Sequence, residues 1–382
     1  MLLRASAAAA GYCLLSPLAA RLAVALPEGN ELLVRSAEPL NAEPRLVALA
    51  TDRITAVKNF YVRNHGPIPR IELRDHKITI EGLVHKPFSL SIAELNDRFS
   101  QYEVEATLTC AGNRRQEISA IKPVTGVQWD AGAIGNARWT GAALADVLQA
   151  AEWQEGAKHV WFEGLDPIKE KDGSVAPFGG SIPLARALAG NTALLAHAMN
   201  GAPLTAEHGY PLRTVVSGYI GARSVKWLSK ITVSDRPSPN HYVAAAYKLV
   251  QSEDQVQTAA AEPIYPFPVN AAICSPAAGS KLKAGRTTIA GYALPSGESA
   301  CTIDKVELSR DGGRTWTAAN LAGDSRPFAW RLWTAEIDLP PGRHELAVRA
   351  TDSCGNSMPE HGAWNFKGYL FNGWNRLNVE VS

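Results

Sequence analysis

The character of the sequence changes at about Pro268, and this change constrains the fold more than any other feature. From there to the C-terminus, short runs of β-branched and apolar residues alternate with turn signals, and RDGG (310–313) is typical of a hairpin turn. The strand-like runs are TTIAGYAL (287–294), KVELS (305–309), FAWRLWTAEIDL (328–339) and ELAVRATD (345–352). Short strands at this spacing predict a small immunoglobulin-like β-sandwich over residues 268–382. Such a module suits a dimerisation or lid domain.

Residues 31–235 mix strand-like and helical segments, as is typical of an α+β domain. Alternation of Ile78 and Ile80 with polar residues predicts a strand, and Ser91 followed by Glu94 predicts a capping box at the start of a helix. Two further helices are predicted over residues 139–151 and 181–190. A chain of 382 residues exceeds the size of one hydrophobic core, so the predicted fold is an α+β domain followed by the sandwich.

Between these domains, residues 236–267 are rich in proline and polar residues and show weak periodicity. We expect them to form a connecting segment that wraps around the first domain. At the other end, residues 1–30 form a separate unit with an Ala-rich apolar stretch, Arg4, and Ala23-Val24-Ala25, which is similar to a cleavage site. A signal peptide, a transit peptide and a misassigned start codon are all compatible with this segment.

The composition of the chain argues against some classes of binding partner. A formal charge of +1 and the lack of a basic run argue against nucleic acid, and no later stretch has the ~20 apolar residues of a membrane span. The five cysteines include no CxxC pair, and their odd number argues against a disulfide framework. The compartment stays open: periplasmic or otherwise exported if residues 1–25 are a signal peptide, and cytoplasmic if they are not.

One cysteine has sequence neighbours that suit a reactive or metal-binding thiol. Cys110 follows a β-branched approach in TLTCAGNRR, and Arg114 and Arg115 come shortly after it. Cationic neighbours lower the pKa of a thiol, which suits a nucleophile or a metal ligand. A buried structural cysteine beside surface arginines explains the same motif, because free cysteines are commonly buried.

An ordered set of further motifs is spread over the chain from Ser36 onward. In the first domain they are SAEPLNAEP (36–44), FYVRNHGPIP (60–69), TLTCAGNRR (107–115), GVQWDAGAIGNARW (126–139), HVWFEGLD (159–166), FGGSIPL (178–184), AMNGAPL (198–204) and HGYPLRTVVSGYIGARSVKWL (208–228). In the sandwich they are GYA (291–293), DGGRTW (311–316), FAWRLW (328–333) and WNFKG (364–368). Together these motifs resemble the sulfite oxidase family, which includes the molybdopterin domains of sulfite oxidases and assimilatory nitrate reductases. The resemblance implies a molybdopterin-binding domain followed by a dimerisation domain, and hence a homodimer.

This resemblance implies a molybdenum atom held by one pterin, two oxygen ligands and the sulfur of Cys110. The pterin-binding residues carried over from the family pattern are Tyr61, Val62, Arg63, Asn64, His65, Asp166, His208, Arg213, Ser224, Val225 and Lys226. Because the pterin carries a phosphate, Arg213 and Lys226 are sensible contacts. Taken singly, His208 also suits a turn and Lys226 a solvated surface charge.

For the substrate, the family pattern nominates Arg63, Arg115 and Tyr247, with Trp129 lining the pocket. Without the resemblance these residues would be surface charges and core aromatics. In WNFKG this sequence departs from the pattern, because sulfite oxidases commonly present arginine where Lys367 stands and nitrate reductases methionine. Lysine keeps the cation but loses the bidentate guanidinium, so we interpret Lys367 as favouring sulfite over nitrate.

The implied reaction is oxidation of sulfite to sulfate, with electrons passed to an external acceptor because the sequence has no CxxCH for haem. Cytochrome c is the first choice if the protein is exported, and oxygen the second if it is not; export conflicts with the lack of adjacent arginines in residues 1–30. The alternatives are a nitrate or sulfoxide reductase, a dehydrogenase of protein-bound sulfur intermediates, and a non-catalytic oxyanion-binding protein.

Overall fold

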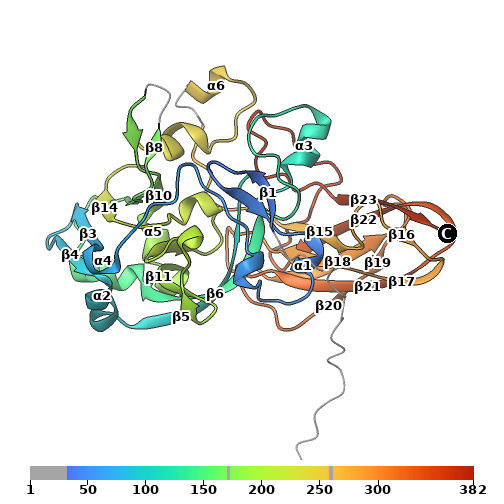
Figure 1. Cartoon of the computed structure of the whole chain (residues 1–382), viewed down its shortest axis with the longest axis horizontal. Coiled ribbons are helices and arrows are strands. Elements are labelled where there is room, and N and C mark those ends of the chain that lie inside the picture. The colour runs from blue at the N-terminus through green and yellow to red at the C-terminus, as the bar shows by residue number, and fades with distance from the viewer. Residues whose placement is uncertain (1–31, 170–172, 258–260) are drawn as a thin grey trace, which may run out of the picture.

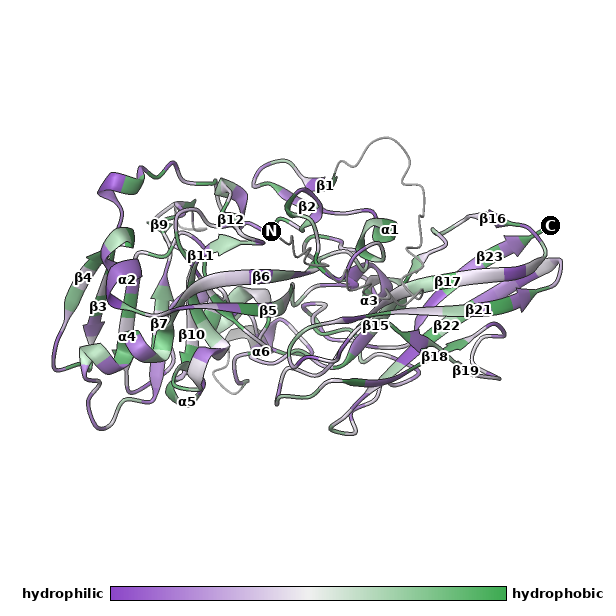
Figure 2. Cartoon of the chain, turned by 90° about the horizontal axis from the view of Figure 1, so that it is seen from below, coloured by the Kyte–Doolittle hydropathy of each residue, from purple (hydrophilic) through white to green (hydrophobic). Residues whose placement is uncertain are grey.

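The computed structural model describes residues 32–169, 173–257 and 261–382, so the predicted targeting segment over residues 1–30 lies outside the described residues. The described chain forms two bodies along one long axis, and both views place the sandwich at the end opposite β3 and β4 (Figures 1 and 2). Strands outnumber helices in both bodies. None of the helices in the described ranges is long and apolar enough to cross a bilayer.

Two five-stranded sheets form the frame of the first domain. One has the order β10-β7-β14-β3-β4, and the other joins β12, β11, β6 and β5, with β13 paired to β11. The first comprises β3 (Lys77–Gly82), β4 (Phe88–Ser91), β7 (His159–Glu163), β10 (Gly179–Pro183) and β14 (Lys230–Ser234), and the second β5 (Gln101–Thr109), β6 (Ile134–Ala143), β11 (Ala193–Met199), β12 (Ala202–Pro203) and β13 (Arg213–Val216). Only β3 and β14 pair in parallel among these strands. The domain is α+β, as predicted.

Short helices and hairpins complete this domain. The α-helices are α1 (Leu46–Leu49), α2 (Ile92–Arg98), α3 (Arg115–Ile121), α4 (Leu144–Ala151) and α5 (Leu184–Ala187), with α6 (Asp254–Gln257) in the connecting segment. The small hairpins are β1 (Leu33–Ser36) with β2 (Asn41–Glu43), and β8 (Ile168–Lys169) with β9 (Val175–Ala176). Single turns of 3-10 helix lie at Val57–Asn59, Leu73–Asp75, Gly190–Thr192, Ala206–His208 and Gly221–Arg223, and a π-helical turn at Tyr242–Ala246. The capping box predicted at Ser91 and Glu94 is present at the start of α2.

Two of the predicted helices were wrong over their first residues, which are strands. Residues 139–143 continue strand β6, and the helix begins only at Leu144. Residues 181–183 belong to β10, and α5 begins after Pro183 rather than at a Ser181 cap. In both places the pairing with neighbouring strands overrides a helical spacing of apolar residues, since sheet formation is decided by tertiary contacts.

The C-terminal body is the predicted sandwich of two sheets. One sheet has the order β15-β17-β21-β20 and the other β16-β23-β22-β18-β19. Their strands are β15 (Asn270–Ser275), β16 (Lys281–Leu282), β17 (Gly285–Leu294), β18 (Ile303–Ser309), β19 (Thr317–Ala318), β20 (Asn320–Leu321), β21 (Arg331–Leu339), β22 (Gly342–Asp352) and β23 (Asn375–Val381). A separate apolar core fills the space between the sheets, with Trp333 fully buried in it.

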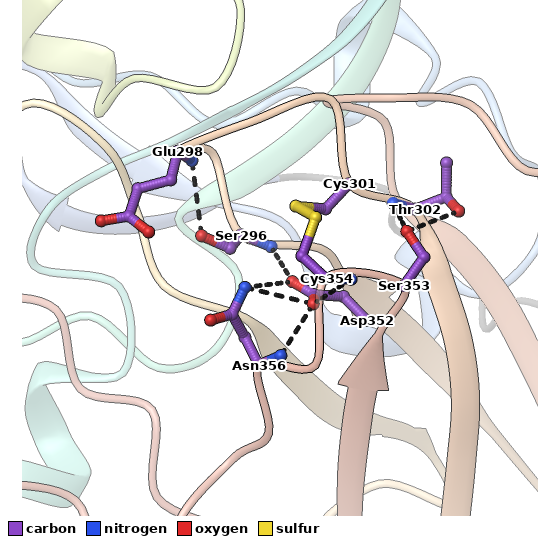
Figure 3. The surroundings of a disulfide bond; sticks show 8 residues. All are labelled: Ser296, Glu298, Cys301, Thr302, Asp352, Ser353, Cys354 and Asn356. Carbon is purple, nitrogen blue, oxygen red and sulfur yellow. Dashed lines mark hydrogen bonds between the residues drawn. A yellow bond between two sulfur atoms is a disulfide. The ribbon is translucent and has the colours of Figure 1, made fainter.

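The odd cysteine count argued against a disulfide framework, but one pair of cysteines does form a disulfide. Cys301 and Cys354 are bonded across 53 positions of the chain, between the start of β18 and the loop after β22 (Figure 3). Of the other three cysteines, Cys110 and Cys274 are free, buried thiols, and Cys13 lies outside the described residues. Beside the bond, the buried carboxylate of Asp352 accepts hydrogen bonds from the backbone N–H groups of Ser296, Cys354 and Asn356.

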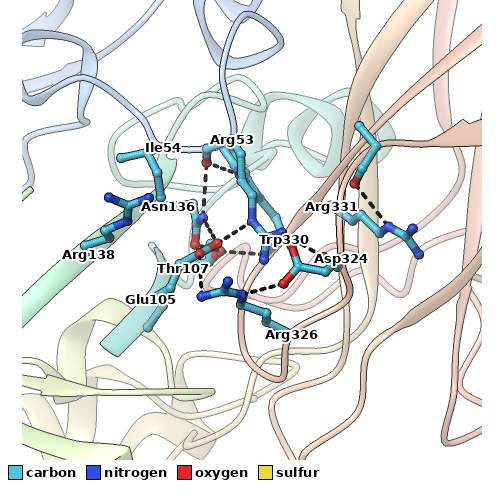
Figure 4. Close-up of polar contacts among 12 residues, drawn as sticks. Arg53, Ile54, Glu105, Thr107, Asn136, Arg138, Asp324, Arg326, Trp330 and Arg331 are labelled. Carbon is cyan, nitrogen blue, oxygen red and sulfur yellow. Dashed lines mark hydrogen bonds and ion pairs between the residues drawn. The ribbon is translucent and has the colours of Figure 1, made fainter. Parts of the chain in front are cut away.

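The two domains share a continuous contact rather than a flexible joint. Tyr292 and Trp330 of the sandwich belong to the same apolar cluster as the interior of the first domain. A polar network lies beside it, in which Arg53 donates to Glu105 at 2.5 Å and to the carboxylate of Asp324 at 2.8 Å (Figure 4). Because Glu105 lies on β5, the sandwich also braces the strand that leads to Cys110.

Candidate functional site

A pocket in the first domain brings together side chains that lie far apart in the sequence. It contains about 680 Å³ of space not filled by atoms, part of it open to solvent. Eleven of the residues predicted for the site border it: Tyr61, Arg63, Asn64, His65, Cys110, Asp166, His208, Arg213, Ser224, Lys226 and Tyr247. The folded chain therefore assembles one cavity from most of the residues that the family pattern nominated.

Cys110 lies directly after β5, at the wall of this pocket. β5 pairs with β6 along its whole length, and the N–H of Cys110 donates to the carbonyl of Ala133 at 2.9 Å, which extends that pairing by one residue. The thiol is 8% exposed, and the backbone N–H of Gly112 donates to its sulfur at 3.4 Å. A rigid strand end thus presents a soft ligand to the cavity, with a backbone donor to stabilise a thiolate.

Two buried cations, Arg213 and Lys226, form one side of the pocket. Arg213 begins β13, and its guanidinium donates to the carbonyls of His208 at 3.0 Å and Ser224 at 3.1 Å. Lys226 donates to the side-chain oxygen of Asn64 and, at 2.8 Å, to the carbonyl of Glu207. Burial lowers the pKa of Arg213 to about 10, and burial together with Arg213 holds the pKa of Lys226 well below its usual value.

Two histidines of the pocket are held in the neutral form. Burial, followed by the charges of Lys226 and Arg213, lowers the pKa of His208 to about 4. Burial and the cation of Arg63 hold the pKa of His65 well below its usual value. The ring of His65 stacks on Phe178, with ring centroids 4.7 Å apart. A neutral imidazole keeps one donor and one acceptor nitrogen, so both rings can pass or hold a proton.

Tyr247 reaches the pocket from the connecting segment. The π-helical turn over Tyr242–Ala246 precedes it directly, and the buried guanidinium of Arg223 fixes this segment through the carbonyls of Tyr242 at 3.1 Å and Ile264 at 2.9 Å. The Tyr247 hydroxyl forms a 2.8 Å hydrogen bond with Nε2 of His65. Burial raises the pKa of Tyr247 far above neutral pH, so the phenol stays protonated.

Arg63 lines the same pocket and interacts electrostatically with this tyrosine. Its guanidinium donates to the side-chain oxygen of Asn41 at 3.1 Å and to the carbonyl of Asn64. Burial lowers the pKa of Arg63, but Tyr247 and Cys110 act in the opposite direction and the pKa is raised overall. A permanent positive charge therefore lies close to the sulfur of Cys110.

Five predicted residues lie outside the pocket lining. Val62 pairs its backbone with Ala42, and the N–H of Val225 donates to Thr214. Trp129 is fully buried in the apolar cluster that contains Cys110, and its indole nitrogen has no partner among the described residues.

The other two residues outside the lining, Arg115 and Lys367, lie at the boundary between the first domain and the sandwich. Arg115 is buried and donates to the carbonyls of Val127 at 2.8 Å and Gly368 at 3.2 Å. Lys367 precedes that glycine in the same loop, with Nζ 5.8 Å from the ring centroid of Phe366. Both residues thus lie where the two domains meet.

The pocket is also lined by residues that were not predicted from the motifs. Phe60, Phe178, Glu207 and Trp227 line it. All four are direct neighbours of, or lie within, the quoted motifs, so position in a motif was the available signal. Their aromatic rings flank His208 and His65, since Phe60 lies 5.5 Å edge-on to His208.

The chemistry of these donors fits a phosphorylated pterin with a thiolate-bound metal. Arg213 and Lys226 repel each other in a buried space, and this repulsion is relieved by an anion. The pocket lining holds three cations, Arg63, Arg213 and Lys226, against two carboxylates, Asp166 and Glu207, so positive charge is in excess. A free cysteine at the wall supplies the soft ligand.

Comparison with known proteins identifies the family of each of the two domains. Residues 65–242 match the oxidoreductase molybdopterin binding domain family, and residues 261–382 match the Mo-co oxidoreductase dimerisation domain family. The chain is 42% identical to the sulfite oxidase of Gallus gallus over 364 residues, which cover 92% of this chain and 78% of that protein. It is 39% identical to the sulfite oxidase of Arabidopsis thaliana over 380 residues, covering 93% of this chain and 95% of that protein.

A solved structure has the same fold. The sulfane dehydrogenase SoxCD from Paracoccus pantotrophus superposes with a TM-score of 0.77 at 25% sequence identity, covering 96% of this chain and 98% of that chain. Similarity therefore extends over both domains.

Proposed function

This chain belongs to the sulfite oxidase family of molybdopterin-dependent oxidoreductases, and we propose that it oxidises sulfite to sulfate. The reaction consumes one water and releases two protons and two electrons. A molybdenum–pterin group bound in the pocket would supply oxygen-atom transfer and take up the two electrons. The observation that carries the proposal is the gathering of the Cys110 thiol with Arg63, Arg213 and Lys226 in one pocket of a chain of this family.

The residues proposed to hold the cofactor fall into two groups. Cys110 provides the metal ligand from the end of β5. The remaining residues surround the pterin and its phosphate, and they are Tyr61, Asn64, His65, Asp166, His208, Arg213, Ser224 and Lys226, with Val62 and Val225 shaping the backbone beside them. The buried cations attract the phosphate, and Gly221 and Ala222 of the turn at Gly221–Arg223 lie in the same lining.

Substrate binding is assigned to the residues around Tyr247. Arg63 attracts the sulfite anion by its charge, while the protonated phenol of Tyr247 donates a hydrogen bond to an oxygen of the substrate. His65, held neutral beside this phenol, can donate its Nε2–H to the phenol oxygen, which leaves the phenol proton for the substrate. Arg115 and Lys367 add positive charge from the domain boundary, and Trp129 supports Cys110 from the core.

The two electrons leave to an external acceptor, for which we propose cytochrome c. Disulfides persist in oxidising compartments, so the bond between Cys301 and Cys354 supports an exported protein and with it this acceptor rather than oxygen in the cytoplasm. The Mo-co oxidoreductase dimerisation match over residues 261–382 supports a homodimer formed through the sandwich.

Two measurements test the function. Protein produced in a host that makes the pterin cofactor should contain close to one molybdenum per chain by elemental analysis. It should then reduce cytochrome c, or a dye of similar potential, on addition of sulfite. Turnover of nitrate with a reduced dye, or of carrier-bound sulfane without turnover of free sulfite, would replace sulfite oxidation by one of the related activities. Protein without molybdenum would support oxyanion binding only.

A further inference from the structure

A loop of the sandwich reaches across to the first domain beside the thiol. It connects β22 to β23, and the N–H of Phe366 donates to the carbonyl of Val250 at 2.8 Å. The N–H of Leu370 donates, also at 2.8 Å, to the carbonyl of Ala111, the residue that follows Cys110. The backbone between these two points is therefore tied both to the connecting segment and to the turn that carries the metal-ligand candidate.

Tyr369 is the aromatic residue held between these ties. Asn365 fixes its backbone on both sides, accepting from the N–H of Tyr369 at 3.0 Å and donating to its carbonyl at 2.7 Å. Its ring stacks on that of Tyr247, with centroids 5.2 Å apart and planes 24° from parallel. The guanidinium carbon of Arg115 lies 5.1 Å from the centroid of the same ring, and Arg115 also donates to the carbonyl of Gly368.

The ring of Tyr369 contacts both Tyr247 and Arg115, and each contact has its own physical reason. Among the described residues the hydroxyl of Tyr247 has one hydrogen-bond partner, His65, and rotation of the side chain about χ1 would break that bond. A stacked neighbour resists such rotation because aromatic rings prefer offset parallel contact. Arg115 is drawn to the electron-rich face of a ring in the same way. The phenol itself stays protonated, since burial raises the pKa of Tyr369.

We propose that Tyr369 is a positioning residue for sulfite oxidation: it sets the orientation of Tyr247 toward His65 and holds Arg115 at the domain boundary. This inference rests on the proposed function. It assigns the sandwich a part in the active site beyond dimerisation, because its loop supplies the ring that orders the residues of the first domain. Loss of the ring should weaken binding of the substrate anion more than it changes the fold.

The test compares variants of the full, cofactor-loaded chain. Tyr369→Leu removes the aromatic face and should raise KM for sulfite at least fivefold and lower kcat/KM about tenfold. Tyr369→Phe keeps the face and should stay within twofold of the original protein. Trp364→Leu is the matched control, because Trp364 lies on the same loop and donates to the carbonyl of Lys122 at 2.9 Å without stacking on Tyr247. It should leave KM unchanged.

Two readouts are independent of turnover. Isothermal titration calorimetry should show sulfate binding weakened at least fivefold in Tyr369→Leu, and a crystal structure of that variant should show the bond between Tyr247 and His65 lengthened or lost. If Tyr369→Leu does not fold, Tyr369→Met replaces it, since methionine fills the space without an aromatic face.

Unchanged KM, sulfate affinity and bond length in Tyr369→Leu, or an equal loss in Trp364→Leu, would overturn the inference. A wild-type chain that binds molybdenum but does not oxidise sulfite would instead overturn the proposed function, and the crystal structure would still decide the role of Tyr369.

Discussion

The hydroxyl of Tyr247 lies 2.8 Å from Nε2 of His65, although 182 positions separate the two residues in the chain. The bond joins the connecting segment to the first domain at the wall of the pocket. Both groups are uncharged at neutral pH, because burial raises the pKa of the phenol and lowers that of the imidazole. Moving the phenol proton to the imidazole would create a buried phenolate–imidazolium pair, which burial disfavours, so the hydrogen bond holds the two groups in place as neutral partners.

Removing the Tyr247 hydroxyl tests this relationship. We expect Tyr247→Phe to lower kcat/KM for sulfite at least tenfold, because loss of one positioned hydrogen-bond donor at a reacting centre typically costs about 10²- to 10³-fold in kcat, while the unfolding free energy changes by only about 1 kcal/mol. Steady-state kinetics and urea unfolding measure the two effects. The control is Tyr102→Phe, which removes a phenol hydrogen bond to Asp146 elsewhere in the same domain. Full activity in Tyr247→Phe would contradict the assignment.

Replacement of Cys110 separates a metal ligand from a structural thiol. Cys110→Ser should lose sulfite oxidation to below a few per cent while its circular dichroism spectrum and melting temperature stay close to those of the original protein, because serine is a poor soft ligand. Cys274→Ala changes the other free buried thiol, which lies in the sandwich, and should keep activity in the folded fraction. More than a few per cent of activity in cofactor-loaded Cys110→Ser would exclude it as an essential ligand.

The pocket lysine should have opposite effects on the two forms of the protein. Lys226→Met removes a buried cation that repels Arg213, so the cofactor-free protein should be equally or more stable. The same change removes a contact for the phosphate, so molybdenum and pterin content after purification should fall at least fivefold. Lys230→Met, a change at a half-exposed lysine paired with Glu163, is the control. Equal cofactor content in both variants would show that Lys226 does not hold the anion.

His208 predicts a pH dependence of stability in the cofactor-free protein. In the unfolded chain its pKa is about 6.5, whereas the folded pKa is about 4, so below pH 6.5 the unfolded state binds a proton that the folded state does not. Stability should therefore fall as the pH drops from 6.5 to 4, by about 3 kcal/mol from this residue alone. Urea unfolding of the original protein and of His208→Phe at several pH values isolates the contribution. Identical slopes would contradict it.

The disulfide should stabilise the sandwich. Its 53-position loop corresponds to about 4 kcal/mol in the chain-entropy estimate, and measured losses on removal of native disulfides are commonly about 2–5 kcal/mol. We expect Cys301→Ser combined with Cys354→Ser to lower the unfolding free energy within this range, with kcat/KM unchanged in the folded fraction. Chemical denaturation under non-reducing conditions measures it, and the original protein with reductant should behave like the double variant.

Much of the architecture could be predicted from local patterns. Alternation and turn signals after Pro268 predicted the sandwich, and the capping pair Ser91 and Glu94 predicted the start of α2. Residues 139–143 and 181–183 were predicted wrongly because their apolar spacing also suits a helix, and only pairing with β11 and β7 makes them strands. The disulfide between Cys301 and Cys354 likewise could not be predicted from the sequence, since it depends on how two strands approach each other in the fold.

For the site, the sequence by itself determined which groups carry the chemistry: a thiol in TLTCAGNRR, basic residues in the SGYIGARS region, and a tyrosine in the connecting segment. Only the tertiary structure decided which of these groups lie next to one another. It buried Arg213 and Lys226 together, which lowers their pKa values and calls for an anion, and it placed Tyr369 of the sandwich on Tyr247. Residue type sets what a side chain can do, whereas burial and neighbours, which depend on distant segments, set its charge and orientation.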